Sequence, residues 1–496
     1  KEFLLSQGRV FQSETDTEVV AQLLDYYYDG NPLETIKKVM HELEGSFALG
    51  IVFADFKDTV YAVRCESPLI VGVGENESFI ASDVPAILKY TKDYYLLEHG
   101  EIAVLNKSGV TVYDRHLNEI KKELKTADWD MDAAEKGGYE HFMLKEIHEQ
   151  PNAIKTTIAP RITDGLPNLE ECGITPEILK GFNQIYVVAC GTAMHAGLMG
   201  KSIIEKLCRI PVEVDIASEF RYRNPIIDEK TLCIFVSQSG ETADTLAALR
   251  LSKSHGARTL AISNVIGSTI TREADYTIYT HAGPEIAVAS TKAYTSQVCL
   301  IAMLGIYFAE LLGSYSKDEL EKLKADILDL PSKIEAVLDN SKEIKTFASK
   351  VYTQKDMFFL GRGTDYNVAL EGSLKLKEIS YIHSEAYAAG ELKHGPIALI
   401  ENGVTVIGII TNKELVEKTI SNMQEVITRG AKTLIITNQI LPNNNFGYVI
   451  NIPETNELIS PILSVIPLQL LSYYISKNKG LDVDKPRNLA KSVTVE

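Results

Sequence analysis

The chain has 496 residues, with 50 Lys and Arg against 67 Asp and Glu, so its formal net charge is −17. At roughly 100–200 residues per domain this length predicts two to four domains, and 45 % apolar residues are enough for buried cores. The acidic balance and the lack of any Lys/Arg cluster argue against binding to nucleic acid or an anionic membrane, because clustered cations hold phosphate groups.

Short β-rich runs separated by turns fill the first part of the chain, after two expected helices at 17–28 and 33–43. The runs recur about every ten residues with alternating apolar and polar side chains, which predicts a mostly antiparallel sheet and an α+β domain. The expected strands are 46–54, 59–64, 69–73, 78–82, 101–105 and 110–113. A charged segment at 118–132 follows, contains the only Trp, Trp129, and is interpreted as a linker.

Beyond this segment the pattern changes to apolar strands separated by helices, which predicts a parallel sheet covered on both faces. The expected strands are 185–189, 212–216, 231–236 and 259–262. The pattern then repeats. Nine residues from Gly256 match nine from Gly430 at six positions, an offset of 174, and Gly191 corresponds to Gly363 at an offset of 172. These matches indicate an internal duplication of an α/β domain.

A hydroxyl-rich turn joins the expected strand 231–236 to an expected helix at 243–252. Ligands of open parallel sheets bind at this edge, where the helix N-terminus offers free N–H groups and a positive dipole end. One hydroxyl here would be an ordinary helix cap, but several in one turn favour a phosphate site without Lys. The residues are Ser237, Gln238, Ser239, Gly240 and Thr242. The corresponding segment 409–415 of the second copy lacks the pattern, so only the first copy is expected to hold phosphate.

Two more junctions of the first copy carry hydroxyls and fit the wall of a pocket. They are 190–193, directly after a strand, and 288–294, which opens a long apolar helix ending near Leu312. Ser290 is the expected cap of that helix. The longest apolar run, 298–312, is interrupted by Gly305 and Glu310 and does not reach the roughly 18 residues of a membrane span.

The second copy carries the titratable groups. Glu371, Lys375 and Glu378 share one face of an expected helix at 371–379, with Leu374 and Ile379 turned inward, and a solvated ion-pair face is the alternative. His394 lies in a Lys-His-Gly-Pro loop that suits a presented imidazole, although a lone histidine is more often structural. The polar tail 482–496 is interrupted by Pro and is not expected to be helical; such tails usually fray.

The six cysteines show no CxxC pairing and no ligand-like spacing to histidines. We therefore expect no disulfide framework and no metal site, and the pattern suits a reduced cytoplasm. The first ten residues do not form a signal peptide. No cofactor is expected.

The segments 237–245, 286–292, 370–383, 385–396 and 484–496 together resemble the glutamine:fructose-6-phosphate aminotransferases, also called glucosamine-6-phosphate synthases. The resemblance runs from about Ser13 to the last residue. It implies an α/β protein in which an α+β N-terminal-nucleophile glutaminase domain precedes two doubly wound parallel-sheet SIS (sugar isomerase) domains. The implied domains are 1–130 (glutaminase, partial), 131–335 (first SIS), 336–480 (second SIS) and 481–496 (active-site tail).

The resemblance also implies an activity and site residues. The family uses ammonia from glutamine to convert fructose 6-phosphate into glucosamine 6-phosphate. Glu378 is implied to move a proton between C1 and C2 with Lys375 beside it, and Lys491 in the tail to form an imine, which requires a free amine. His394 is implied to open the sugar ring from the neighbouring subunit of a homodimer. The implied sugar-phosphate-binding residues are Thr192, Ser237, Gln238, Ser239, Thr242, Val288 and Ser290, and Asp16 is the remaining glutamine-site residue.

The sequence departs from the family in two places. Position 193 is Ala where bacterial members have Ser. The chain starts at Lys1, without the N-terminal Cys nucleophile or the Arg-Trp and Asn-Gly motifs of the glutaminase, and Cys65 does not replace them. We therefore expect this chain to carry out only the sugar half of the reaction, with ammonia as nitrogen donor.

Two other functions stay open at this point. A sugar-phosphate-binding regulator built from SIS domains would need the phosphate site but not the acid–base residues. A phosphosugar isomerase or deglycase with an unrelated N-terminal domain would need both, and ammonia-dependent product formation separates it from a synthase.

Overall fold

The computed structural model describes the chain except for residues 66, 83, 85, 128–134, 163–164, 443–445 and 495–496. The chain forms two compact units, one of residues 1–134 with 494–496 and the other of residues 135–493. Trp129 and the expected boundary between 130 and 131 lie outside the described residues. The boundary at 335 between the two expected SIS domains stays a prediction.

The first unit has two antiparallel sheets and three helices, as an α+β domain requires. The helices are α1 (Glu2–Ser6), α2 (Asp16–Tyr27) and α3 (Pro32–Met40). The strands are β1 (Phe47–Ile51), β2 (Val60–Cys65), β3 (Ile70–Val73), β4 (Ser78–Ala81), β5 (Asp93–Leu96), β6 (Ile102–Asn106), β7 (Gly109–Tyr113), β8 (Glu119–Ile120) and β9 (Lys125–Thr126). One sheet has the order β1-β2-β6-β7-β8 and the other β4-β3-β5-β9.

Side chains alternate across β2 and explain the layering of this unit. Tyr61 and Val63 pack with Leu23 of α2 and Ile36 of α3, whereas Ala62 lies in a second cluster, with Val71 of the other sheet. Because successive strand residues face opposite sides, one strand serves both cores. The expected strands of this unit are confirmed to within a few residues.

The interpretation of 118–132 as a linker is wrong for its first part. β8 pairs with β7, and β9 pairs with β5, so residues up to Thr126 belong to the sheets of the first unit. The hydroxyl of Thr126 donates a hydrogen bond of 2.6 Å to the carboxylate of Asp93. Strands of two residues carry no periodic pattern, which is why the sequence did not reveal them.

The second unit contains two five-stranded parallel sheets. Its first half comprises α4 (Phe142–His148), α5 (Gln150–Ile158), α6 (Pro176–Lys180), β10 (Gln184–Ala189), α7 (Gly191–Cys208), β11 (Val212–Ile216), α8 (Ala217–Phe220), β12 (Thr231–Ser237), α9 (Ala243–Ser254), β13 (Arg258–Ser263), α10 (Thr269–Glu273), β14 (Tyr276–Tyr279) and α11 (Lys292–Leu312). α12 (Lys317–Asp339) and α13 (Lys342–Val351) lead to the second half, which comprises β15 (Asp356–Gly361), α14 (Thr364–Ser380), β16 (His383–Ala388), β17 (Thr405–Ile410), α15 (Val416–Ile427), β18 (Lys432–Thr437), β19 (Tyr448–Asn451) and α16 (Ser460–Asn478).

The two sheets repeat one topology, which confirms the predicted duplication. Their orders are β11-β10-β12-β13-β14 and β16-β15-β17-β18-β19, with parallel pairing throughout. β15 and β17 begin 172 and 174 residues after β10 and β12. The strands reverse order at equivalent places in both copies, which is where doubly wound sheets bind ligands.

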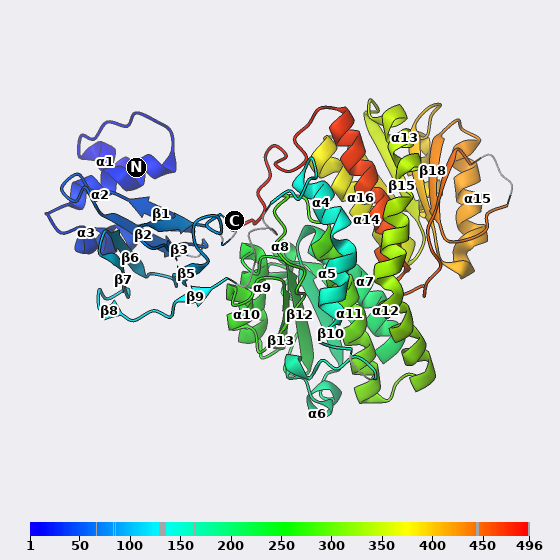
Figure 1. Cartoon of the computed structure of the whole chain (residues 1–496), viewed down its shortest axis with the longest axis horizontal. Helices are drawn as coiled ribbons and strands as arrows, with labels where there is room; N and C mark the ends of the chain where they lie inside the picture. The colour runs from blue at the N-terminus through cyan, green and yellow to red at the C-terminus, as the bar shows by residue number, and fades with distance from the viewer. Residues whose placement is uncertain are drawn as a thin grey trace. The chain divides into compact units, whose positions relative to one another are not determined.

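Helices cover both faces of each sheet (Figure 1). α7, α11, α14 and α16 lie between the two sheets, α9 lies on the outer face of the first sheet and α15 on the outer face of the second. In β12 the side chains of Ile234 and Val236 join the cluster between the sheets, whereas Cys233 and Phe235 join the outer cluster under α9. A strand that is buried on both faces therefore has a continuous run of apolar residues in its sequence.

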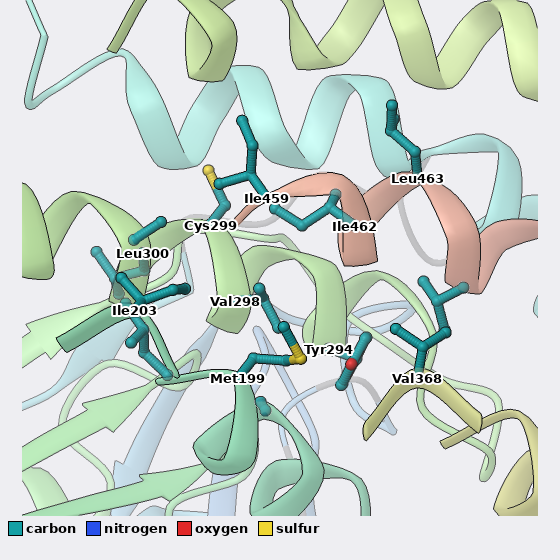
Figure 2. Packing of buried hydrophobic residues seen from close by; sticks show 14 of the residues in the cluster. Met199, Ile203, Tyr294, Val298, Cys299, Leu300, Val368, Ile459, Ile462 and Leu463 are labelled. Atoms are coloured by element: carbon teal, nitrogen blue, oxygen red, sulfur yellow. The ribbon is translucent and has the colours of Figure 1, made fainter. Parts of the chain in front are cut away.

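A single core joins the two copies. Figure 2 shows Met199 of α7, Tyr294 and Val298 of α11, Val368 of α14 and Ile462 of α16 converging in it. Among the described residues only α11 has the length and hydropathy of a membrane span, and most of it is buried in this core. The shared core fixes α7 of the first copy against α14 of the second.

Candidate active site

A cavity of about 120 Å³ lies where β10 and β12 end. It is lined by Cys190 and Ala193 after β10, by the turn after β12, by Gln297 of α11 and by the tail. The predicted site residues on its wall are Thr192, Ser237, Gln238, Ser239, Thr242, Ser290 and Lys491. Residues up to 301 positions apart in the sequence, Cys190 and Lys491, therefore line one cavity.

The turn after β12 has the form of an anion cradle. The N–H of Gly240 donates to Ser237 Oγ at 3.0 Å, and the N–H of Glu241 donates to Ser239 Oγ at 3.2 Å. Within the described residues, the side chain of Thr242 makes no cap hydrogen bond to α9, although Thr242 is its N-cap. Its hydroxyl lies 3.3 Å from that of Ser237. The hydroxyls thus converge on the helix N-terminus, where an anion is stabilised.

Gly240 is required by the backbone of this turn. Its φ is +68°, in the left-handed region that favours glycine. A Cβ at this position would lie 2.0 Å from Ser268 Oγ and 2.6 Å from Ser268 Cβ. The turn can approach the next loop this closely only because residue 240 has no side chain.

A buried polar chain connects the second copy to this cavity. Lys375 Nζ lies 2.6 Å from Glu378 Oε2 and 3.5 Å from Glu371 Oε1, and it donates to Thr192 Oγ1 at 2.8 Å. Thr192 in turn donates to Glu371 Oε1 at 3.1 Å, and His195 Nδ1 lies 2.7 Å from Glu371 Oε2. The side chains of Lys375 and Glu371 are 1 % and 0 % exposed, so the alternative of a solvated ion-pair face is wrong.

The charge on Lys375 is fixed by its neighbours. Burial acts to lower the pKa of Lys375, but the Glu378 and Glu371 carboxylates outweigh it and the pKa is raised. Lys375 is therefore a cation and hydrogen-bond donor at neutral pH. Among the ionisable side chains Lys375, Glu371, His195 and Glu378, that of Glu378 is the most exposed, at 20 %. Ile379 is buried as expected, whereas Leu374 is only half-buried.

The tail after α16 is held against this unit by hydrogen bonds as far as Val493, which its composition alone left open. The carboxylate of Asp484 accepts the N–H groups of Phe142 and Met143 at 2.9 Å each, where α4 begins. Its carbonyl accepts the N–H of Val288 at 3.0 Å. Further along, the carbonyl of Val493 accepts the N–H of Ala243, the first residue of α9. The tail thus reaches the same helix end as the cradle.

The side chain of Lys491 forms an ion pair with the buried carboxylate of Glu285. Lys491 Nζ donates to Glu285 Oε2 at 2.5 Å and to the carbonyl of Ala287 at 2.9 Å. Burial acts to raise the pKa of Glu285, but the Lys491 ammonium and several hydrogen bonds outweigh it and lower the pKa to about 2. Ser290 Oγ also donates to Glu285 Oε2, at 2.7 Å, and the N-cap of α11 is Thr291. The prediction that Ser290 caps this helix is therefore wrong.

Five predicted site residues are not on the cavity wall. Lys375 and Glu378 are two of them, and Lys375 is linked to the wall through its hydrogen bond to Thr192. Val288 is half-buried beside it and contributes a backbone N–H to the tail. His394 is exposed in the short 3₁₀ helix Glu391–His394 and does not line the cavity. Asp16 is exposed at the start of α2 in the first unit. Glu378, Lys375 and Thr192 are thus joined by direct contacts, whereas His394 lies apart from them.

Three polar residues of the site, Glu285, His195 and Gln297, were missed from the sequence, and Glu371 was noted only as part of a charged helix face. Glu285 holds Lys491, Glu371 and His195 hold the Lys375 group, and Gln297 lines the cavity with a buried side-chain oxygen that has no hydrogen-bond partner among the described residues. His195 follows Thr192 by one helical turn, which could have indicated a shared face. The other pairings depend on chain segments far apart and left no local signal.

A hydroxyl cradle at the switch point of a parallel sheet, beside a second copy that supplies ionisable groups, defines an α/β protein with a candidate anion-binding site. The SIS domain family matches residues 178–307 and 350–476, and the glutamine amidotransferase domain family matches residues 1–89. A glutamine–fructose-6-phosphate aminotransferase [isomerizing] of Clostridium tetani is 59 % identical over the whole chain and 82 % of its own length. The chain belongs to the glutamine–fructose-6-phosphate aminotransferase (isomerizing) family.

Solved structures agree with the fold. The C-terminal domain of glucosamine-fructose-6-phosphate aminotransferase from Francisella tularensis is 40 % identical, with a TM-score of 0.68 over 71 % of this chain and 100 % of that one. A glucosamine-6-phosphate deaminase from Thermotoga maritima, at 24 % identity, has a TM-score of 0.54 over 71 % of this chain and 99 % of its own. The second likeness concerns the fold alone.

Proposed function

We propose that residues 135–493 convert fructose 6-phosphate and ammonia into glucosamine 6-phosphate, with glutamine as the source of the ammonia in the family's full reaction. The observation that carries this proposal is the single cavity lined by the Ser237–Thr242 turn and by Lys491. An anion cradle beside a lysine suits a substrate that has a phosphate at one end and a carbonyl at the other.

The phosphate of the sugar is assigned to the turn after β12. The hydroxyls of Ser237, Ser239 and Thr242 and the N-terminus of α9 supply donors, and no cation is needed because the helix end carries a partial positive charge. Gln238 lines the same wall. Thr192 and Ser290 lie across the cavity and are assigned to the sugar hydroxyls, with Val288 beside them.

Lys491 is assigned to imine formation with the open-chain ketose. Its amine adds to the C2 carbonyl carbon, forming a C–N bond, and the carbonyl oxygen leaves as water after protonation. The Lys491 ammonium must first leave Glu285 and give its proton to solvent, so the contact with Glu285 describes the resting ammonium.

Glu378 is assigned to proton transfer between C1 and C2, with Lys375 as a fixed cation that holds the Glu378 carboxylate in place. Thr192 contacts Lys375, so the first copy positions a residue of the second. His394 is assigned to ring opening in the site of a partner subunit, which its exposed position off the cavity supports. We further propose a cytoplasmic homodimer.

The test is product formation from fructose 6-phosphate and ammonium chloride, followed by mass spectrometry of glucosamine 6-phosphate. Glu378→Gln should abolish turnover while fructose 6-phosphate still binds, and Glu414→Gln, an exposed change on the second copy, serves as the control. Sugar binding without turnover in the unmodified chain would favour a regulator. Interconversion of sugars without nitrogen incorporation would favour an isomerase.

A further inference from the structure

Glu146 is a buried carboxyl group behind the lysine site that the proposed mechanism does not use. It lies on α4 and is 2 % exposed. Its Oε1 accepts the N–H groups of Ile286 and Ala287, at 2.5 and 3.2 Å. Its Oε2 is buried with no hydrogen-bond partner among the described residues. The two N–H groups directly follow Glu285, and the Ala287 carbonyl accepts from Lys491, so one short loop links both carboxyl groups to the lysine.

The charges around Glu146 do not favour a second anion there. The charged or titratable groups described around this part of α4 are Glu285, Lys491, Lys292, Lys145, Glu149, Asp484, Lys136, His141 and Tyr473. Lys292 is already paired with Glu149 at 2.7 Å, and Asp484 is held by the N–H groups that begin α4. The lysines described nearby are paired with other carboxylates, Lys491 with Glu285 and both Lys292 and Lys145 with Glu149. An ionised Glu146 would therefore be a buried carboxylate without an ion pair of its own.

The protonation state of Glu146 follows from this environment. Burial and the Glu285 carboxylate, opposed by Lys491, raise the pKa of Glu146 to about 8. An unpartnered buried oxygen also costs less free energy in a neutral acid than in a carboxylate. Glu146 is therefore uncharged below about pH 8, and its carbonyl oxygen holds the 286–287 backbone.

We propose that Glu146 is a positioning residue for Lys491: as an uncharged acid it supports the loop under the lysine without adding a second anion behind it, and so lets Lys491 become a free amine. An anionic Glu146 would stabilise the ammonium and hold it in place. The proposal rests on the imine role of Lys491 in the proposed function. It predicts that ionisation of Glu146 makes the loss of the Lys491 proton harder.

The test measures the titration of Lys491 without substrate, by competitive acetylation with acetic anhydride between pH 7 and 10 and mass spectrometry of the tail peptide. Glu146→Gln keeps the shape of the neutral acid and never ionises. At pH 9 the variant should have about three- to tenfold more unprotonated Lys491 than the unmodified chain, since coupled groups shift one another by about one pKa unit. Glu140→Gln, an exposed change before α4, should titrate like the unmodified chain.

Identical Lys491 titration curves for Glu146→Gln and the unmodified chain would overturn the proposal. If the variant does not fold, the titration of the unmodified chain still tests the proposal. Coupling to Glu146 should bend the titration curve of Lys491 near pH 8, whereas the curve of a single independent site would exclude the coupling. Reductive trapping with cyanoborohydride and fructose 6-phosphate separates the two proposals. Absence of an adduct on Lys491 contradicts the proposed function, whereas an adduct together with uncoupled titration contradicts only the role of Glu146.

Discussion

Gly240→Ala tests whether the phosphate cradle depends on the close approach of two loops. The residue has φ +68°, which costs a non-glycine residue about 1–2 kcal/mol. The new Cβ would also lie 2.0 Å from Ser268 Oγ and 3.0 Å from Ile270 Cγ2, and Ser268 is buried. Overpacking of this kind costs about 1–3 kcal/mol. We expect the substitution to lower the free energy of unfolding by about 2–5 kcal/mol.

Gly256→Ala is the matched control for this change. Gly256 follows α9 with φ +83°, but the nearest atom to its Cβ would be Glu229 N at 4.0 Å. The control therefore carries the backbone cost of about 1–2 kcal/mol without the steric one. Both variants are compared with the unmodified chain by urea unfolding followed by circular dichroism, and by the KM for fructose 6-phosphate in the ammonium-dependent reaction.

The two measurements separate packing from backbone strain. Gly240→Ala should be the less stable variant. It should also raise the KM, because its Cβ would push the turn away from Ser268 and shift the N–H that residue 240 donates to Ser237 in the cradle. Gly256→Ala should leave the KM near that of the unmodified chain. If Gly240→Ala is no less stable than Gly256→Ala and its KM is unchanged, the reasoning from the Ser268 contact is refuted.

Three further predictions concern buried charges. Burial and Glu285 raise the pKa of Glu146 to about 8, against about 4.5 in the unfolded chain. The protonated group therefore contributes stability that is complete below pH 4.5 and is lost as the pH rises to 8, on the order of several kcal/mol. The urea midpoint of the unmodified chain should fall between pH 5 and 8, and that of Glu146→Gln should lack this fall. Lys375→Met leaves the buried Glu371 without its cation and should cost about 3–5 kcal/mol in urea unfolding and abolish turnover. Glu285→Gln removes the counter-ion of Lys491, so limited proteolysis at pH 7 should cut the tail faster than in the unmodified chain.

The parallel sheets were predictable because their signal is local. β12 and its neighbours are buried on both faces, so each appears in the sequence as a short, nearly continuous apolar run between helices. The duplication was visible because equivalent strand–helix junctions keep equal spacing. β5, β8 and β9 were missed because they are short and are defined only by pairing with strands far away in the chain.

The candidate site was predictable where one loop carries the chemistry and not where two loops share it. The turn Ser237–Thr242 combines strand end, hydroxyls and helix start within a few residues. Glu285, by contrast, meets Lys491 from 206 positions away, and His195 meets Glu371 from 176 positions away. The spacing of charges in the sequence placed Glu371 on one face of a helix, but only the packing of α7 against α14 shows that this face is buried.

That packing explains how two copies of one fold came to depend on each other. The first copy kept the cradle, and the second lacks it but places Lys375 and Glu378 on α14. Thr192, the second residue of α7, donates to Glu371 and accepts from Lys375, so a hydroxyl of the first copy completes the polar chain of the second. A charged helix face inside a core is stable only with such partners, since an unpaired buried charge costs several kcal/mol. Neither copy could therefore be separated from the other without exposing apolar core and leaving Glu371 and Lys375 with fewer partners.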